Sequence, residues 1–197
     1  MRIAILILSI LGAIICLGLG GYQVACAGCA GSCAAAANEA STVVATMEES
    51  NGSGIDKPSS TSSNKDMETM ASVMGTVAFA NLCSAIGLVL QAILGVAGGI
   101  VTFSRLGGGQ KAKKGAVLLS AAVGITVLAH LIGVIMVLNI DESTFPAKNH
   151  TAIGFLVILV MGALLHGIAT VMAFLAKPNE VLEPNYQSPT DHPPQSA

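Results

Sequence analysis

Four long apolar stretches constrain the fold of this chain more than any other feature. They cover residues 3–21, 79–103, 115–138 and 151–176, and none of them contains Asp, Glu, Lys or Arg. A helix needs about 20 mainly apolar residues to cross the hydrocarbon core of a bilayer. Only 10% of the 197 residues are charged, whereas soluble domains carry about 25%. We therefore expect an integral membrane protein whose solvent is the lipid bilayer.

The spans are expected to be helices. Backbone groups in lipid must be hydrogen-bonded within the spanning element, so only helices and closed barrels cross membranes. The stretches lack the alternation of apolar and polar residues that barrel strands show. The predicted fold is all-α, with four transmembrane helices in an antiparallel bundle. The chain then divides into a first transmembrane helix (1–21), an outer loop (22–78), a three-helix transmembrane core (79–176) and a tail (177–197).

Positive charges predict the orientation of the spans. Six of the nine Lys and Arg residues lie before the first span, between the second and third spans, or after the fourth: Arg2, Arg105, Lys111, Lys113, Lys114 and Lys177. The other two connections hold only Lys57, Lys65 and Lys148. Connections rich in Lys and Arg stay on the cytoplasmic side. Both termini are therefore expected in the cytoplasm, in a plasma membrane or cell inner membrane, with residues 22–78 outside.

The first span has an alternative interpretation as a cleavable signal peptide. It begins with Arg2, continues as an apolar run, and is followed by Ala25-Cys26-Ala27, which fits the small-x-small pattern of a cleavage site. The apolar run of about 18 residues is longer than the roughly 7–15 usual for such peptides, which favours a retained helix. A lipoprotein site at Cys29 fits less well, because Cys26 stands where an aliphatic residue is wanted.

The segments outside the spans are polar. Residues 38–69 are rich in Ser, Thr, Asn and acidic residues, so we expect a long flexible outer loop, whose first third contains helix formers that would prolong the first helix. The tail carries five of the seven prolines and is expected to be disordered. The glycosylation sequence is matched at Asn51 and Asn149, both on the predicted outer side.

Gln91, His130 and His166 are the most polar side chains deep within the spans. Polar residues at this depth face the bundle interior and are functional candidates. The depths of His130 and His166 differ by roughly 7–8 Å at about 1.5 Å per residue, and Gln91, near mid-span, would reach either. Two histidines on separate helices allow a haem with both as axial ligands. The offset instead favours neutral, hydrogen-bonded core histidines, and no cofactor is expected.

Sulfur-bearing side chains form two ladders at the outer ends of the first two spans. Each ladder has members at i, i+3 and i+7, and the residues are Cys26, Cys29, Cys33, Met67, Met70 and Met74. Thiolate and thioether ligands select Cu(I) and similar ions, so the ladders predict a soft-metal site. A Cys3His zinc site with His150 is a second possibility for the cysteines. The simpler interpretation is a methionine packing stripe beside cysteines that pack, or oxidise to an intermolecular disulfide.

No catalytic motif is present in the sequence. The spans contain no acidic residue, and the loop RLGGGQKAKK lacks the phosphate-binding P-loop pattern. The net charge of -2 offers no basic surface for nucleic acid. Small residues at helical spacing, such as Gly87, Gly95 and Gly98, instead predict close helix packing.

We therefore expect a protein without enzymatic activity that acts by helix packing or association, as a scaffold, assembly factor or complex subunit. Its expected partners are the lipid bilayer and either further copies of itself or other membrane proteins. The alternative function is that of a small membrane protein that binds a soft metal of the copper type through the Cys and Met ladders.

Overall fold

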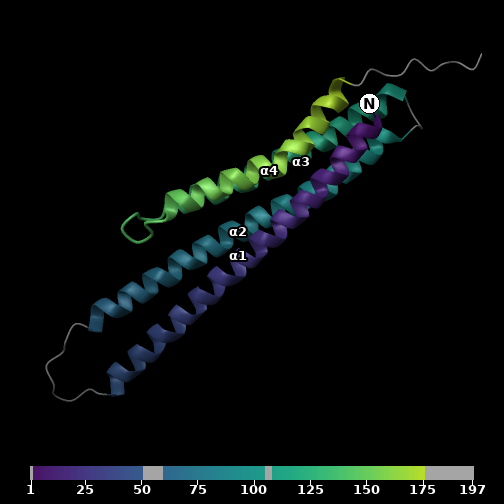
Figure 1. Cartoon of the computed structure of the whole chain (residues 1–197). Coiled ribbons are helices and arrows are strands. Elements are labelled where there is room, and N and C mark those ends of the chain that lie inside the picture. The colour runs from purple at the N-terminus through teal and green to yellow at the C-terminus, as the bar shows by residue number, and fades with distance from the viewer. Residues whose placement is uncertain (1, 51–59, 105–107, 176–197) are drawn as a thin grey trace, which may run out of the picture.

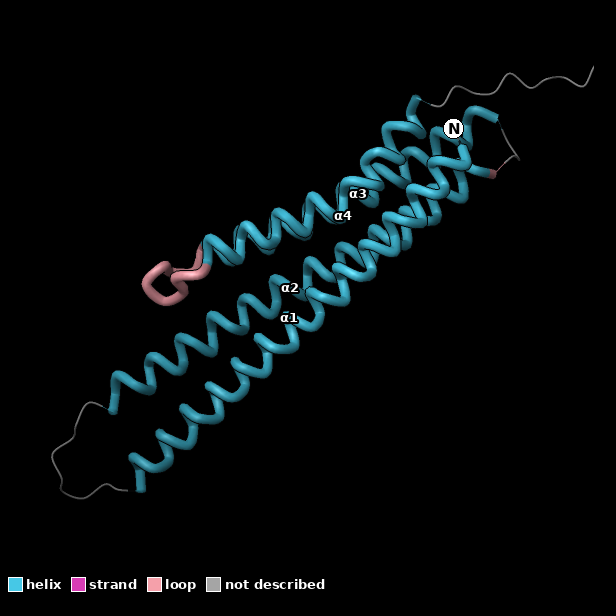
Figure 2. The backbone as a smooth tube through the Cα atoms, viewed as in Figure 1, coloured by secondary structure: helices cyan, strands magenta, loops and turns pink. Residues whose placement is uncertain are grey.

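The computed structural model describes residues 2–50, 60–104 and 108–175. These residues form four helices, namely α1 (Arg2–Ser50), α2 (Ser60–Phe103), α3 (Gly108–Leu138) and α4 (Lys148–Leu175) (Figure 1). Each helix is long enough and apolar enough to cross a membrane. For the described part of the chain, this confirms the all-α fold and the four candidate transmembrane helices. Figure 2 shows how little of it lies outside helices, the longest such segment being the loop 139–147 between α3 and α4.

α1 and α2 continue well past the apolar stretches that predicted them. They contain 49 and 44 residues, which corresponds to roughly 74 and 66 Å at about 1.5 Å per residue. Residues 38–50 continue α1, which confirms that the first third of the outer loop prolongs the first helix. Residues 60–69 are helical as well, which corrects the flexible loop that we expected there. The glycosylation candidate Asn51 and the tail from residue 176 onward lie outside the described residues.

Local hydrogen bonds explain why this polar stretch is helical. Thr42 Oγ1 donates to the Asn38 carbonyl oxygen at 2.9 Å, and Thr69 Oγ1 donates to that of Lys65 at 2.6 Å. A hydroxyl that bonds one turn back along the helix is satisfied without leaving the helical conformation. The alanines at 34–37 add strong helix propensity. Polar composition therefore did not prevent helix formation here, where hydroxyl groups such as those of Thr42 and Thr69 bond within their own helix.

The four helices form a closed ring, in which α1 contacts α2, α2 contacts α3, α3 contacts α4, and α4 contacts α1. Residue numbers run in opposite directions along α1 and α2, because Ser9 lies against Gly99 and Gly20 lies against Leu88. Along α2 and α3 they also run in opposite directions, as Gly98 faces Leu119 and Gly87 faces Ala129. This register gives the relative depth of residues on different helices.

Small side chains are common in the interior of the ring, beside larger ones such as Leu88 and Leu119, and large aliphatic side chains cover its outside. Ala13, Ala92 and Ala169 are buried, and residues of this size let membrane helices approach closely. On the outside, the side chains of Ile14 and Leu164 are 61% and 55% exposed. The exposed surface differs from that of a soluble protein, where large aliphatic side chains are most often inside.

The ends of α1 and α2 project past the loop between α3 and α4 (Figure 1). We define the arm as residues 34–50 of α1 and 60–74 of α2, which the register of the two helices places side by side. The arm exposes polar side chains, including Glu39, Lys65 and Glu68. Ala37 and Ala71 are half-buried. We call the four-helix part of the molecule the bundle. The bundle therefore exposes large aliphatic side chains, whereas the arm exposes polar ones.

Candidate functional site

Three fully buried polar side chains from three helices meet within the bundle: Cys16 of α1, Gln91 of α2 and His166 of α4. Gln91 Nε2 donates to the Gly162 carbonyl oxygen at 2.9 Å and lies 3.2 Å from His166 Nδ1. Cys16 Sγ donates to the same carbonyl at 3.4 Å and lies 4.0 Å from Nδ1. An amide nitrogen only donates, so a hydrogen bond between Gln91 Nε2 and His166 Nδ1 requires Nδ1 to accept. His166 Nε2 has no hydrogen-bond partner among the described residues.

Two glycines make room for the imidazole of His166. A Cβ added to Gly95 of α2 would overlap the ring, and one added to Gly12 of α1 would lie 2.7 Å from His166 Nδ1. The ring is therefore held between two helix backbones and has no space to turn aside. The sequence placed Gly95 on a packing face, and the structure shows that this face packs against the histidine.

A second level of buried polar side chains lies closer to the arm. Ser84, His130 and Gln23 are fully buried on α2, α3 and α1. His130 Nδ1 lies 3.0 Å from the Thr126 carbonyl oxygen. Ser84 Oγ, His130 Nε2 and both amide atoms of Gln23 have no hydrogen-bond partner among the described residues. Such unsatisfied buried groups are uncommon in proteins and call for an explanation.

The two histidines lie at different depths. His166 lies beside Gly95, whereas Thr126, one turn before His130, donates to the Gly87 carbonyl oxygen at 3.1 Å. The rings are therefore separated along α2 by about eight residues, or roughly 12 Å at about 1.5 Å per residue. Two imidazoles this far apart do not fit as axial ligands of one haem iron. The sequence placed both His130 and His166 within reach of Gln91. In the structure, Gln91 contacts His166.

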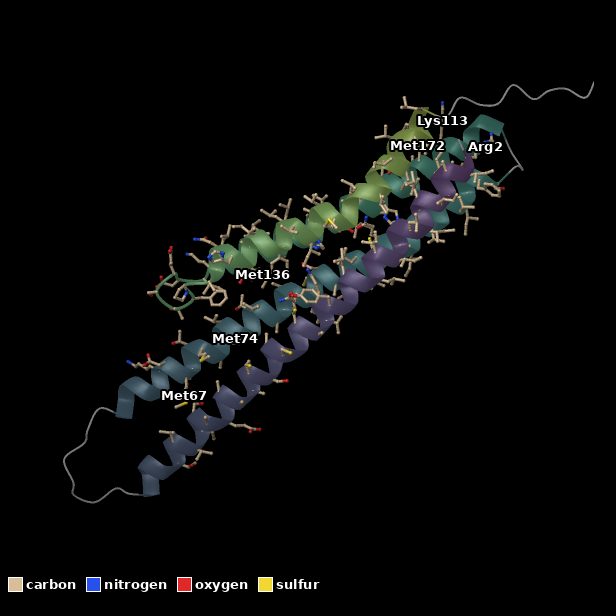
Figure 3. All side chains as sticks on the ribbon, in the orientation of Figure 1. Arg2, Met67, Met74, Lys113, Met136 and Met172 are labelled. Carbon is tan, nitrogen blue, oxygen red and sulfur yellow. The ribbon has the colours of Figure 1, made fainter. Side chains whose placement is uncertain are left out.

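The sulfur ladders are only partly brought together. All three cysteines are free thiols; Cys29 and Cys33 are exposed and Cys26 is half-buried. The register of α1 and α2 places Cys33 level with Met74, while Met67 lies further out along the arm (Figure 3).

The methionines divide between packing and exposure. Met67 and Met74 are half-buried and Met70 is exposed, so two of the three have the burial expected of a packing stripe. Within the described ranges, no group of three or more His, Cys, Asp or Glu side chains is placed to hold a metal ion, and His150 is exposed at the start of α4. A soft-metal site of Cys and Met ligands stays a prediction, which copper analysis of the purified protein and its Cys29→Ser variant would test.

Sequence reasoning did not identify Gln23 or Cys16 as members of a buried polar group. Gln23 lies just beyond the predicted end of the first span, where polar residues are ordinary. The signal that identifies both residues is a spacing of three or four that continues through the buried face of α1. Its members are Ile5, Ser9, Gly12, Cys16, Gly20 and Gln23.

Comparison with protein-family models, with curated proteins and with solved structures finds no match for this chain. The class that the described residues define is an all-helical protein with four helices that are each long and apolar enough to span a membrane. The function is therefore argued from the arrangement of the chain's own residues.

Proposed function

We propose that this chain is a multi-pass membrane protein whose helices cross the bilayer as an antiparallel bundle, and whose arm projects into water and associates with other proteins. It acts as a scaffold, an assembly factor or a subunit of a larger complex, without enzymatic activity. The observation that carries this proposal is the change in surface between the bundle and the arm.

The bundle surface supports membrane insertion. Its outward side chains are large and aliphatic on every helix, as at Ile7, Ile93, Ile135 and Val160. A soluble monomer rarely exposes a continuous apolar surface of this extent. On the arm, the exposed positions of the same two helices include Asn38, Asp66 and Thr69. This change is what a helix pair shows when it leaves lipid and enters water.

The distribution of positive charge supports cytoplasmic termini. Arg2 and Lys113 both lie at the end of the bundle where α1 begins, opposite the arm (Figure 3). Lys114 is exposed next to Lys113. Because positively charged ends of spans stay in the cytoplasm, the arm belongs on the outer side of the membrane.

The length and surface of the arm support association. At about 1.5 Å per residue its α1 part extends roughly 25 Å beyond the bundle, which is more than a connection between two spans requires. Among its polar side chains, Val43 and Met70 are 49% and 53% exposed. The exposed thiols of Cys29 and Cys33 lie at its base. A second copy of the chain is the simplest partner for such a surface.

Removing the arm tests the proposal. Residues 35–73 are replaced by a four-residue Gly/Ser turn, which joins positions that the register places opposite each other. The His166 contacts lie outside the deletion, so the bundle should insert and melt as before. Chemical crosslinking in membranes should give dimers or larger complexes for the full chain and monomers for the variant.

A matched control keeps both arm helices and replaces residues 51–59 by nine Gly and Ser residues. This control should crosslink like the full chain. Equal crosslinking of the arm-deleted and full chains, or a full chain that is monomeric in its own membrane, would contradict the proposal.

A further inference from the structure

A groove of about 270 Å³ opens where α4 begins beside α1 and α2. Its polar lining consists of Tyr22, Gln23, Asn81 and Thr151, with Cys26 beside them. None of the residues that line it is charged. The groove is close to the lower limit of about 300 Å³ for ligand pockets, so it has room for a head group and not for a whole lipid.

Gln23 is the side chain in this groove whose chemistry is unexplained by the fold. It is fully buried, and neither its amide nitrogen nor its amide oxygen has a hydrogen-bond partner among the described residues. Leaving a buried polar group unsatisfied costs about 1–3 kcal/mol. A ligand that offers both a donor and an acceptor would remove this cost, and a hydroxyl group offers both.

Two other polar residues of the groove are already partly engaged. Asn81 Nδ2 donates to the Val77 carbonyl oxygen at 2.9 Å, and Thr151 Oγ1 donates to that of Ala147 at 3.2 Å. Among the polar side chains of the lining, Gln23 is the fully buried one, and both its donor and its acceptor lack a partner among the described residues. The absence of Lys, Arg and His from the lining disfavours an anionic ligand, which would be left without a counter-charge.

The position of the groove relates it to lipid. Gln23 lies just beyond the apolar stretch of α1, and Thr151 lies at the start of that of α4. Phe155 and Ile158 line the groove one and two turns further along α4, toward the middle of the bundle. In a bundle that spans the bilayer, polar groups would thus lie at the membrane surface with an apolar wall leading inward from them.

We propose that this groove binds the uncharged, hydroxyl-bearing head group of a neutral single-chain lipid, such as a monoacylglycerol. A hydroxyl donates to Gln23 Oε1 and accepts from Gln23 Nε2, while the acyl chain leaves the groove past Phe155 and Ile158. This inference rests on the membrane insertion proposed above and is independent of the role of the arm. Water molecules in place of lipid are the competing occupant.

The test uses the full chain in lipid nanodiscs and a monoacylglycerol with a photoreactive diazirine near the head of its acyl chain. Labelling should saturate, should be displaced by unlabelled monoacylglycerol, and should map to peptides around Gln23 and Phe155. Gln23→Leu should reduce labelling at a limiting probe concentration at least fivefold. This variant removes an unsatisfied buried amide, so the fold should not be weakened, which a melting curve checks.

Two controls separate a head-group site from general lipid contact. Ser84→Ala removes another unsatisfied buried group that does not line the groove, and should label like the parent chain. A probe with the same acyl chain and a phosphate head group should label several-fold less.

Equal labelling by the two probes, equal labelling of Gln23→Leu and the parent, or no saturable labelling, as expected for a groove that holds only water, would each overturn the proposal. Extraction by alkaline carbonate reports on membrane insertion separately. A chain that resists extraction and lacks saturable labelling refutes the lipid site alone.

Discussion

The bundle and the arm are built partly from the same two helices, yet their outer surfaces differ. In the bundle, α1 exposes Ile7 and Ile14 and buries Ser9 and Gln23. In the arm, the same helix exposes Asn38 and Glu39. α1 is continuous from Arg2 to Ser50, so no break in the backbone marks the boundary. The outward side chains alone show where lipid is expected to give way to water.

The largest expected effect comes from placing a charge on the outer surface of each region. Leu164 lies near the middle of α4 and is 55% exposed, and Val43 on the arm is 49% exposed. Leu164→Lys should cost about 2.5–3.5 kcal/mol, because a charge at the bilayer centre loses its hydration. Val43→Lys should stay within about 0.5 kcal/mol, as surface substitutions in water do.

The fraction of each variant that resists alkaline carbonate extraction measures this difference. If this fraction fell equally in both variants, the bundle and the arm would lie in the same solvent, which would contradict the proposed difference between them.

The next effect concerns how closely the helices pack in each region. Gly95→Ala should destabilise the bundle by about 1–3 kcal/mol, because the added methyl overlaps the His166 ring. Gly75, next to the arm on α2, has open space at the position of a Cβ. Gly75→Ala should therefore be neutral or stabilise by up to about 1 kcal/mol through helix propensity. Thermal unfolding in detergent should show a lower melting temperature for Gly95→Ala and an equal or higher one for Gly75→Ala. A melting temperature that Gly95→Ala leaves unchanged or raises would argue against the close approach at His166.

A smaller effect separates the two buried amides within the bundle. Gln91 bonds the Gly162 carbonyl oxygen, whereas Gln23 has no partner among the described residues. Gln91→Leu should cost about 0.6–1.7 kcal/mol, the range found for hydrogen bonds between membrane helices. Gln23→Leu should leave the melting temperature in lipid-free detergent unchanged or raise it. If both variants lost the same stability, Gln23 would have a partner that the structure does not show.

The smallest effect is expected in the loop that joins α3 and α4. The Ser143 backbone N–H donates to Asp141 Oδ1 at 3.2 Å, and this bond holds the pKa of the carboxyl below its ordinary value. The contribution of Asp141 is therefore present above about pH 3.9, and it is lost as the pH falls through the lowered pKa. Hydrogen exchange at the Ser143 amide should accelerate in acid, relative to its intrinsic rate, in the parent chain but not in Asp141→Asn.

The apolar stretches were sufficient to predict the four helices, because each combines the length and the freedom from charge that a span requires. The helical arm was only partly predictable. Its first third carried helix formers, but its Ser, Thr and acidic residues resemble those of flexible loops. Helix formation there depends on local bonds such as that from Thr69 to the Lys65 carbonyl oxygen, and on pairing with a distant segment that composition does not reveal.

The sequence predicted that certain polar residues lie inside the bundle, but it did not predict which residues they contact. Gln91, His130 and His166 stand out in the sequence because a polar residue at bilayer depth is costly. Which histidine Gln91 contacts depends on the register of α2 and α4, which the sequence does not specify. Gln23 escaped notice because it lies just outside the apolar stretch, and only the helix neighbours that enclose it show that it is buried.

The most direct test of the account is the accessibility of single thiols in intact cells. Chains that keep only Cys29 or only Cys16 are treated with a mild impermeant reductant and then with an impermeant maleimide. Cys29 is exposed beside the arm and Cys16 is buried within the bundle. The account predicts that Cys29 is labelled before the cells are permeabilised and that Cys16 is labelled only after denaturation. Labelling of Cys29 only after permeabilisation would place the arm in the cytoplasm, and labelling of Cys16 in untreated cells would contradict a lipid-embedded bundle.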